Sequence, residues 1–225
     1  MTEAAKVAEK SGLKVKVVEF TDYITPNRAL ADKALDVNVY QHEPFLNNFN
    51  KNQNTNLVKI ADAVVQPMGL YSDSVKSLES VPEGTKIAIP NDPTNGGRAL
   101  ILLKAAGLID LKPGVTGNTA TVADISLNPK RLKIAELEAA QLPRSLKDVD
   151  VACVPMNYAI SGKLSPEKQG FYFESREAPF ALMVIAARPD NAESKDVKAF
   201  VKAYQSPEVK AFIETTFKGA VKAAW

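Results

Sequence analysis

The sequence contains one cysteine, Cys153, and one histidine, His42. A single cysteine cannot form a disulfide within the chain, and a single histidine excludes a metal site built from several histidines. Cys153 lies in the apolar run VDVACVP, which predicts a buried, unreactive thiol rather than a catalytic one. No metal and no cofactor are therefore expected.

The sequence also lacks an excess of charge of either sign and any long apolar run. It has 28 basic and 26 acidic residues, a net charge of +2, and the two signs are well mixed. This pattern excludes the basic stripe of a nucleic-acid-binding protein and a polybasic membrane patch. No apolar run approaches 18 residues, and residues 1–10 form a polar helical pattern rather than a secretion signal.

What the sequence does contain is typical of an α/β protein of one large domain or two lobes. Of its 225 residues, 45% are hydrophobic, and apolar runs alternate with helical patterns. We expect strands over residues 13–20, 37–40, 57–67, 86–90, 149–155, 171–175 and 180–188. We expect helices over residues 2–11, 28–36, 43–54, 74–80, 95–106 and 136–142, a helix starting at 157, and two closing helices.

The run FALMVIAAR, residues 180–188, is apolar throughout. Such a strand is buried on both faces, which is typical of a parallel or mixed sheet with flanking helices. In open sheets of this kind, ligands bind at the carboxyl ends of the strands. Polar and aromatic side chains at predicted strand ends are therefore the candidate site residues.

The stretch IAIPNDPTNGGRALILL, residues 87–103, passes from a predicted strand through a polar turn into a predicted helix. Thr94 is the expected N-cap, and the helix start supplies unpaired N–H groups. Gly96 and Gly97 allow close approach to the backbone, and Arg98 offers a fork suited to a carboxylate or a phosphate. No P-loop pattern is present, so the turn is either an anion site or a plain connector with a surface arginine.

Three other stretches place candidate residues where strands are predicted to end. They are FTDYITPN, YQHEPF and VPMNYA, and the residues are Tyr23, Tyr40, His42, Phe45 and Asn157. Each has a structural alternative, namely packing at a strand end, a structural histidine or a helix cap. Their convergence with Asn95 and Arg98 suggests two lobes that grip one small molecule. No carboxylate pair suited to acid–base catalysis is apparent, which favours a binding protein over an enzyme.

Several stretches together resemble the methionine-binding lipoprotein family, the NlpA-type lipoproteins. The combination of YQHEPF with NDPTNGGR is highly specific, and the resemblance covers nearly the whole chain. The other stretches that carry it are FTDYITPNRAL, DVNVYQHEPFL, PMGLYS, DISLNPKRLKIAELEAAQLPRSLKDVDVA and VPMNYA.

The resemblance implies the two-lobe (type II) periplasmic-binding-protein fold, with methionine or a related amino acid in the cleft between the lobes. It implies an extracytoplasmic protein, lipid-anchored in its full-length form, that delivers its ligand to an ABC permease and ATPase complex. Expected lobe bounds are 1–72 plus 180–225 for the first and 77–178 for the second, with crossovers near 72–77 and 178–181.

The resemblance also assigns roles to the candidate residues. Tyr23, Tyr40, His42 and Phe45 match positions that surround the thioether, and sulfur packs favourably against aromatic rings. Asn95 and Arg98 match positions that hold the carboxylate, and Asn157 matches a further contact to the amino-acid head.

Two departures from the family pattern bear on the ligand and the fold. Leu182 or Met183 stands where the family has an asparagine that grips the amino-acid head. The chain also starts in a helix rather than in the strand with which family members begin. The alternatives that remain are a small-molecule enzyme on the same fold, with His42 as its base, and the effector-sensing domain of a regulator.

Overall fold

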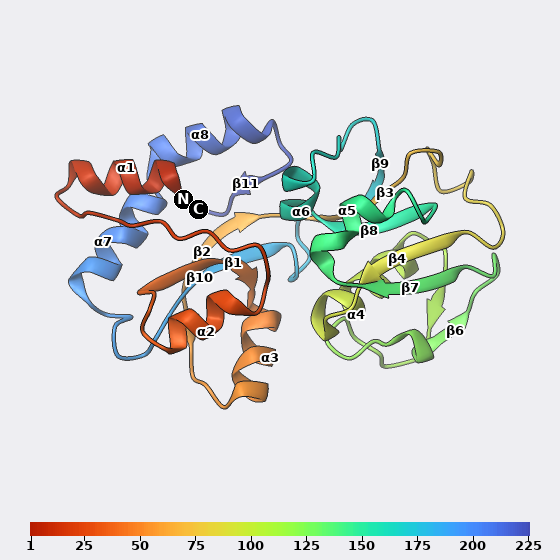
Figure 1. Cartoon of the computed structure of the whole chain (residues 1–225), viewed down its shortest axis with the longest axis horizontal. Helices are drawn as coiled ribbons and strands as arrows, with labels where there is room; N and C mark the ends of the chain where they lie inside the picture. The colour runs from red at the N-terminus through yellow and green to blue at the C-terminus, as the bar shows by residue number, and fades with distance from the viewer. The chain divides into compact units, whose positions relative to one another are not determined.

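The computed structural model describes residues 1–225 and divides into two compact units. Unit 1 comprises Met1–Gln66 and Arg176–Trp225, and unit 2 comprises Pro67–Ser175. Each unit is built on its own sheet with helices packed against it (Figure 1). The chain thus passes from one unit to the other twice.

The sheet of unit 1 has four strands in the order β1-β10-β2-β11. Its strands are β1 (Val37–His42), β2 (Val58–Val65), β10 (Leu182–Ala187) and β11 (Lys222–Ala223). β10 is almost wholly buried, as its apolar run predicts. The prediction of parallel or mixed neighbours for this strand is wrong, because β10 pairs antiparallel with both β1 and β2.

Five helices cover the sheet of unit 1. They are α1 (Thr2–Lys10), α2 (Thr25–Ala31), α3 (Glu43–Gln53), α7 (Lys195–Tyr204) and α8 (Pro207–Phe217). α1 packs against α7 and α8, whereas α2 and α3 pack against β1 (Figure 1). The two closing helices are confirmed, and Ser206 caps α8 by accepting a hydrogen bond from the backbone of Val209, with Pro207 in the first turn.

Residues 13–20 do not form the predicted strand. Leu13, Val15 and Val17 are partly buried and Lys14 and Lys16 are exposed, so the alternation that prompted the prediction is real. The segment nevertheless joins no sheet, because it pairs with no neighbouring strand. Alternation describes which side chains face inward, whereas a strand also needs a partner for its backbone groups.

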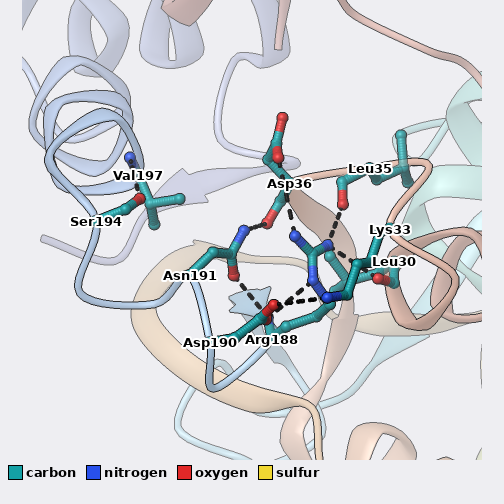
Figure 2. Close-up of polar contacts among 9 residues, drawn as sticks. All are labelled: Leu30, Lys33, Leu35, Asp36, Arg188, Asp190, Asn191, Ser194 and Val197. Atoms are coloured by element: carbon teal, nitrogen blue, oxygen red, sulfur yellow. Dashed lines mark hydrogen bonds and ion pairs between the residues drawn. The ribbon is translucent and has the colours of Figure 1, made fainter.

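A buried arginine just after β10 joins the two chain segments that make up unit 1 (Figure 2). Arg188 donates hydrogen bonds from Nη1 to the carbonyl oxygens of Leu30, at 3.0 Å, and Leu35. Its Nε donates to Asp190 at 3.1 Å, and Asp190 also pairs with Lys33. The hydrogen bond from Lys33 lowers the pKa of the Asp190 carboxyl. The guanidinium thus joins the last turn of α2, at Leu30, and the loop after it, at Leu35, to the chain just after β10.

The main sheet of unit 2 is mixed and has the order β7-β4-β8-β3-β9. Its strands are β3 (Met68–Tyr71), β4 (Lys86–Pro90), β7 (Lys133–Leu137), β8 (Val151–Pro155) and β9 (Gly170–Phe173). β4 runs parallel to β7 and β8, while β3 runs antiparallel to β8 and β9. A separate pair joins β5 (Asp110–Leu111) to β6 (Ile125–Leu127).

The helices of unit 2 follow the parallel strands. They are α4 (Pro93–Ala105), α5 (Leu142–Ser145) and α6 (Met156–Ser161), with 3₁₀ turns at Val122–Asp124 and Ala139–Gln141. α4 contacts β4, and α5 and α6 contact β8. Because parallel neighbours end at the same edge of a sheet, the turns after β4 and β8 open at one edge of unit 2.

Several predicted elements were wrong in type or position. Residues 133–137 form β7, not part of a helix over 136–142, because pairing with β4 overrides their helical propensity. Pro143 lies in the first turn of the short helix α5 instead of ending a helix. Residues 74–80 contain no helix, and α2 begins and ends earlier than the predicted 28–36.

None of the helices combines the length and the apolar character needed to span a bilayer.

Candidate functional site

Four aromatic residues predicted from separate stretches come together in unit 1. The ring centroids of Tyr23, Tyr40 and Phe45 lie 6.0–6.1 Å from one another. His42 lies edge-on to Phe45 at 6.2 Å and to Phe180 at 5.2 Å. The spacing is that of favourable aromatic pairs. The structure therefore places the predicted aromatic residues in one cluster and adds Phe180, which precedes β10.

Tyr40 is placed in this cluster by an irregularity in β1. In the pairing with β10, Val39 faces Ile185 and Gln41 faces Val184, so Tyr40 is the extra residue between them. A bulge of this kind re-aims a side chain and breaks the simple alternation expected along the strand. The hydroxyl of Tyr40 donates to the carbonyl oxygen of Tyr23 at 3.0 Å, which links β1 to the segment before α2.

A buried cluster of amide side chains fastens α2 to β1. Asn27 Nδ2 donates to Gln41 Oε1 and Gln41 Nε2 donates to Asn27 Oδ1, both at 2.7 Å. Asn38 Nδ2 donates to Asn27 Oδ1 at 2.8 Å, and Asn38 Oδ1 accepts from Gln41 Nε2 at 3.0 Å. All three side chains are at most 5% exposed. A fully bonded polar network of this kind fixes one arrangement of the elements that carry it.

The turn that carries Tyr23 is organised by Asp22. Its carboxylate accepts hydrogen bonds from the backbone of Ile24 and Thr25 at 2.7 Å and from the hydroxyl of Thr25 at 2.8 Å. Partial burial raises the pKa of the Asp22 carboxyl, but these hydrogen bonds lower it by more. The turn leads directly into α2, with Pro26 in its first turn.

His42 has a structural role at the junction of β1 and α3. Its Nδ1 accepts a hydrogen bond from the backbone N–H of Phe45 at 3.1 Å, so His42 is the N-cap of α3. A neutral imidazole that accepts at Nδ1 carries its proton on Nε2. This arrangement orients the ring within the aromatic cluster, and it commits one ring nitrogen to the backbone rather than to acid–base chemistry.

In unit 2, the turn between β4 and α4 is capped by Asp92, not by Thr94. The Asp92 carboxylate accepts from the backbone N–H of Asn95 at 3.0 Å and from its side-chain amide at 3.0 and 3.1 Å. The helix begins two residues earlier than predicted because Pro93 suits the first position of a helix. Gly107, with φ +70°, follows the end of α4 as predicted.

The two glycines of this turn admit the protein's own backbone. A Cβ atom on Gly97 would lie 2.1 Å from the carbonyl oxygen of Gly117 and 3.3 Å from that of Ala120. A Cβ atom on Gly96 would lie 2.9 Å from the carbonyl oxygen of Pro90. The close approach predicted for this pair is therefore made by the end of β4 and by the loop at 117–120.

Arg98 is buried and paired with a carboxylate that sequence reasoning missed. Its Nη2 lies 2.6 Å from Glu174 Oε2, and its Nε donates to both oxygens of Glu174 at 3.1 Å. Nη1 lies 3.5 Å from Asn95 Oδ1. The surface arginine of the plain-connector alternative is thus wrong, because the Arg98 side chain is 3% exposed.

Asn157 lies at the second residue of α6, directly after β8, and is half-buried. The alternative that Asn157 is the N-cap of α6 is wrong, since that position is occupied by Pro155. β4 and β8 are adjacent and parallel, so Asn157 belongs to the same edge of the sheet as Asn95 and Arg98.

Neither a thiol nor a metal centre accompanies these groups. Cys153 is fully buried in β8, as predicted, and burial raises the pKa of its thiol, which keeps it protonated and inert. No group of three or more His, Cys, Asp or Glu side chains is arranged to hold a metal ion.

The residues that sequence reasoning missed lie next to residues that it found. Phe180 and Glu174 both precede β10 in the stretch FESREAPF, where only a strand was expected. An aromatic residue after Pro179 and an isolated acid after an aromatic run were the available signals. Neither signal identifies a partner that lies 76 residues away, as Arg98 does from Glu174.

The comparisons with known proteins cover the whole chain. The family model for NlpA lipoprotein matches residues 1–225. The chain is 45% identical to the D-methionine-binding lipoprotein MetQ of Yersinia pestis, over 99% of this chain and 82% of that protein. The name MetQ, and the D-methionine binding that it describes, belong to that relative.

Solved structures match equally completely. A nutrient binding protein from Burkholderia cenocepacia bound to methionine is 48% identical, with a TM-score of 0.96 over 100% of this chain and 94% of that chain. The substrate binding protein of a methionine transporter from Streptococcus pneumoniae is 38% identical, with a TM-score of 0.92 over 100% of this chain and 89% of that chain. The predicted two-lobe α/β fold of a substrate-binding protein is confirmed, and the chain belongs to the NlpA lipoprotein family.

Proposed function

We propose that this chain is the substrate-binding protein of an ABC importer and that it captures methionine or a closely related amino acid. The observation that carries the proposal is the likeness over the whole chain to proteins described as methionine-binding. The protein performs no chemistry of its own. The binding protein works outside the cytoplasm, where a lipid anchor holds its full-length form at a membrane. It delivers its ligand to a complex of permease and ATPase in that membrane.

The aromatic cluster of unit 1 is the proposed site for the thioether end of the ligand. The ring centroids of Tyr23, Tyr40 and Phe45 lie 6.0–6.1 Å apart, and that of His42 lies 6.2 Å from Phe45. A thioether sulfur gains roughly 0.3–1.5 kcal/mol from such aromatic contacts, which a straight hydrocarbon chain lacks. The proposal therefore predicts a preference for methionine over norleucine, in which a methylene replaces the sulfur.

The turn after β4 in unit 2 is the proposed site for the ligand's carboxylate. Arg98 supplies a positive charge in the first turns of α4, where the helix dipole also favours an anion. Asn95 lies beside the Nη1 end of the guanidinium, and Asn157 is the proposed further contact to the amino-acid head. These roles extend the family resemblance residue by residue.

The position where family members have an asparagine leaves the exact ligand open. Leu182 is half-buried and pairs with Val65, while the buried Met183 pairs with His42 of the aromatic cluster. A leucine or methionine there adds apolar surface and no hydrogen-bonding group. The ligand panel must therefore cover L- and D-methionine and short methionine peptides.

Isothermal titration of the purified chain against this panel, with norleucine included, tests the proposal. We expect saturable binding of a methionine ligand, and removal of Arg98 should cost about 2–5 kcal/mol of binding. Arg98→Ala should thus weaken binding at least about tenfold. Arg131→Ala is the matched control, because Arg131 lies in the same unit with its side chain 82% exposed. Absence of heat with every ligand, or an unchanged Kd for Arg98→Ala, would contradict the proposal.

A further inference from the structure

Glu174 holds the guanidinium of Arg98 from one edge. The Nε and Nη2 atoms of Arg98 face the two carboxylate oxygens, with a shortest distance of 2.6 Å. The side chains are 3% and 10% exposed, so water screens the pair little. A two-point contact between a planar fork and a carboxylate fixes orientation as well as distance.

The same carboxylate is bonded to the first strand of unit 2, β3. Glu174 Oε2 accepts from the backbone N–H of Met68 at 3.1 Å, and the N–H of Glu174 donates to the carbonyl oxygen of Met68 at 2.9 Å. Unit 2 begins at Pro67 and ends at Ser175, so Met68 and Glu174 flank the two points where the chain enters and leaves it. Glu174 is thus held by backbone contacts that do not involve Arg98.

We propose that Glu174 is the positioning residue that sets Arg98 for a ligand carboxylate, an inference that rests on the proposed function. An arginine side chain has several rotatable bonds, and a site that orders it only on binding loses affinity to that ordering. Glu174 removes this cost because it holds the fork in place before the ligand arrives. It also supplies the counter-charge without which a buried guanidinium would be unfavourable.

A positioning role makes a different prediction from direct contact or from simple support of the fold. If Glu174 acts through Arg98, loss of the Glu174 carboxylate must lower the affinity for ligands with a carboxylate, whether or not they carry an amino group. If Glu174 instead bound the ligand's ammonium group, only ligands with an amino group would suffer. If the ion pair only supported the fold, every ligand would lose affinity by the same factor.

The test compares Glu174→Gln with the control Glu167→Gln, since Glu167 is an exposed acid in the same unit. Each protein is titrated with methionine, with 4-(methylthio)butanoate, which lacks the amino group, and with methioninamide, which lacks the carboxylate. We expect Glu174→Gln to weaken the binding of methionine and of 4-(methylthio)butanoate at least about tenfold. The Kd for methioninamide, measured at millimolar concentration, should change by less than about twofold in Glu174→Gln. In the control Glu167→Gln, the Kd for each of the three ligands should also change by less than about twofold.

Three results would overturn the inference. They are unchanged methionine affinity in Glu174→Gln, equal losses for all three ligands, and a loss confined to ligands with an amino group. Wild-type protein that bound no methionine would overturn the proposed function instead, so the two failures are distinguishable. Circular dichroism checks the fold of each variant, and if Glu174→Gln does not fold, Glu174→Asp, which is one methylene short of Arg98, is judged by the same three results.

Discussion

Each unit of the chain buries one arginine, and the two guanidinium groups have different partners. In unit 1, Arg188 donates to the carbonyl oxygens of Leu30 and Leu35, and its carboxylate partners Asp36 and Asp190 are 88% and 52% exposed. In unit 2, Arg98 faces the buried carboxylate of Glu174. The same type of side chain therefore bonds backbone carbonyl groups in one unit and forms a buried ion pair in the other.

The difference shows that burial of an arginine is not by itself a sign of a ligand site. The hydrogen bonds of Arg188 go to backbone carbonyl oxygens in α2 and in the loop after it, and this role is complete without a ligand. Burying a carboxylate in the interior costs free energy unless hydrogen bonds and an ion pair satisfy it. Glu174 has both Arg98 and the backbone of Met68, which is why the pair in unit 2 is the one that we connect to ligand binding.

Replacement of Arg188 by alanine should give the largest loss of stability. The variant removes hydrogen bonds from a charged donor to two carbonyl oxygens, each worth about 1.5–3 kcal/mol, so we expect a loss of roughly 3 kcal/mol. Denaturant unfolding measures it, and hydrogen exchange should locate it in unit 1. Arg28→Ala, an exposed arginine in α2, is the control. A methionine affinity that fell as far as in Arg98→Ala, in protein that remained folded, would break the comparison.

Gly97→Ala should disturb unit 2 somewhat less. The new Cβ atom would meet the carbonyl oxygen of Gly117 at 2.1 Å, and backbone cannot move as readily as a side chain. Overpacking of this kind costs about 1–3 kcal/mol. Because Arg98 is the next residue, we also expect weaker methionine binding, which titration would detect. Lys104→Ala in the same helix is the control. Equal free energies of unfolding for the two variants would show that the loop at 117–120 moves to make room for the new Cβ atom.

Tyr40→Phe should have the smallest effect. It removes the hydrogen bond from the Tyr40 hydroxyl to the carbonyl oxygen of Tyr23 and keeps the ring, so the expected loss is about 1 kcal/mol in unfolding. Tyr172→Phe in unit 2 is the control, because the Tyr172 hydroxyl makes no hydrogen bond. An affinity change much above threefold, or about 0.7 kcal/mol, would show that the hydroxyl itself contacts the ligand.

The sequence predicted best where neighbouring residues decide the structure. Ser206 and Pro207 start α8 as expected, and Gly107 follows α4. The strand-to-helix stretch over 87–103 is confirmed apart from its cap, Asp92 instead of Thr94. It predicted least well where a distant segment decides, as in residues 133–137, whose strand exists because β4 lies beside it.

The candidate site follows the same division. Sequence patterns and the family motifs alone pointed to Tyr23, Tyr40, His42, Phe45 and Arg98, because each lies in a short stretch with recognisable chemistry. Only the tertiary structure showed that the rings of the first four meet and that Tyr40 reaches the cluster through a bulge.

The partners of these residues were likewise determined by the tertiary structure. Glu174 meets Arg98 across 76 residues, and Arg188 meets Leu30 across 158. No spacing in the sequence specifies such a pair, because contact between distant residues depends on which strands pair and where their ends fall. Local chemistry determined which side chains could bind a ligand, and the pairing of distant strands determined which of them are held in position to do so.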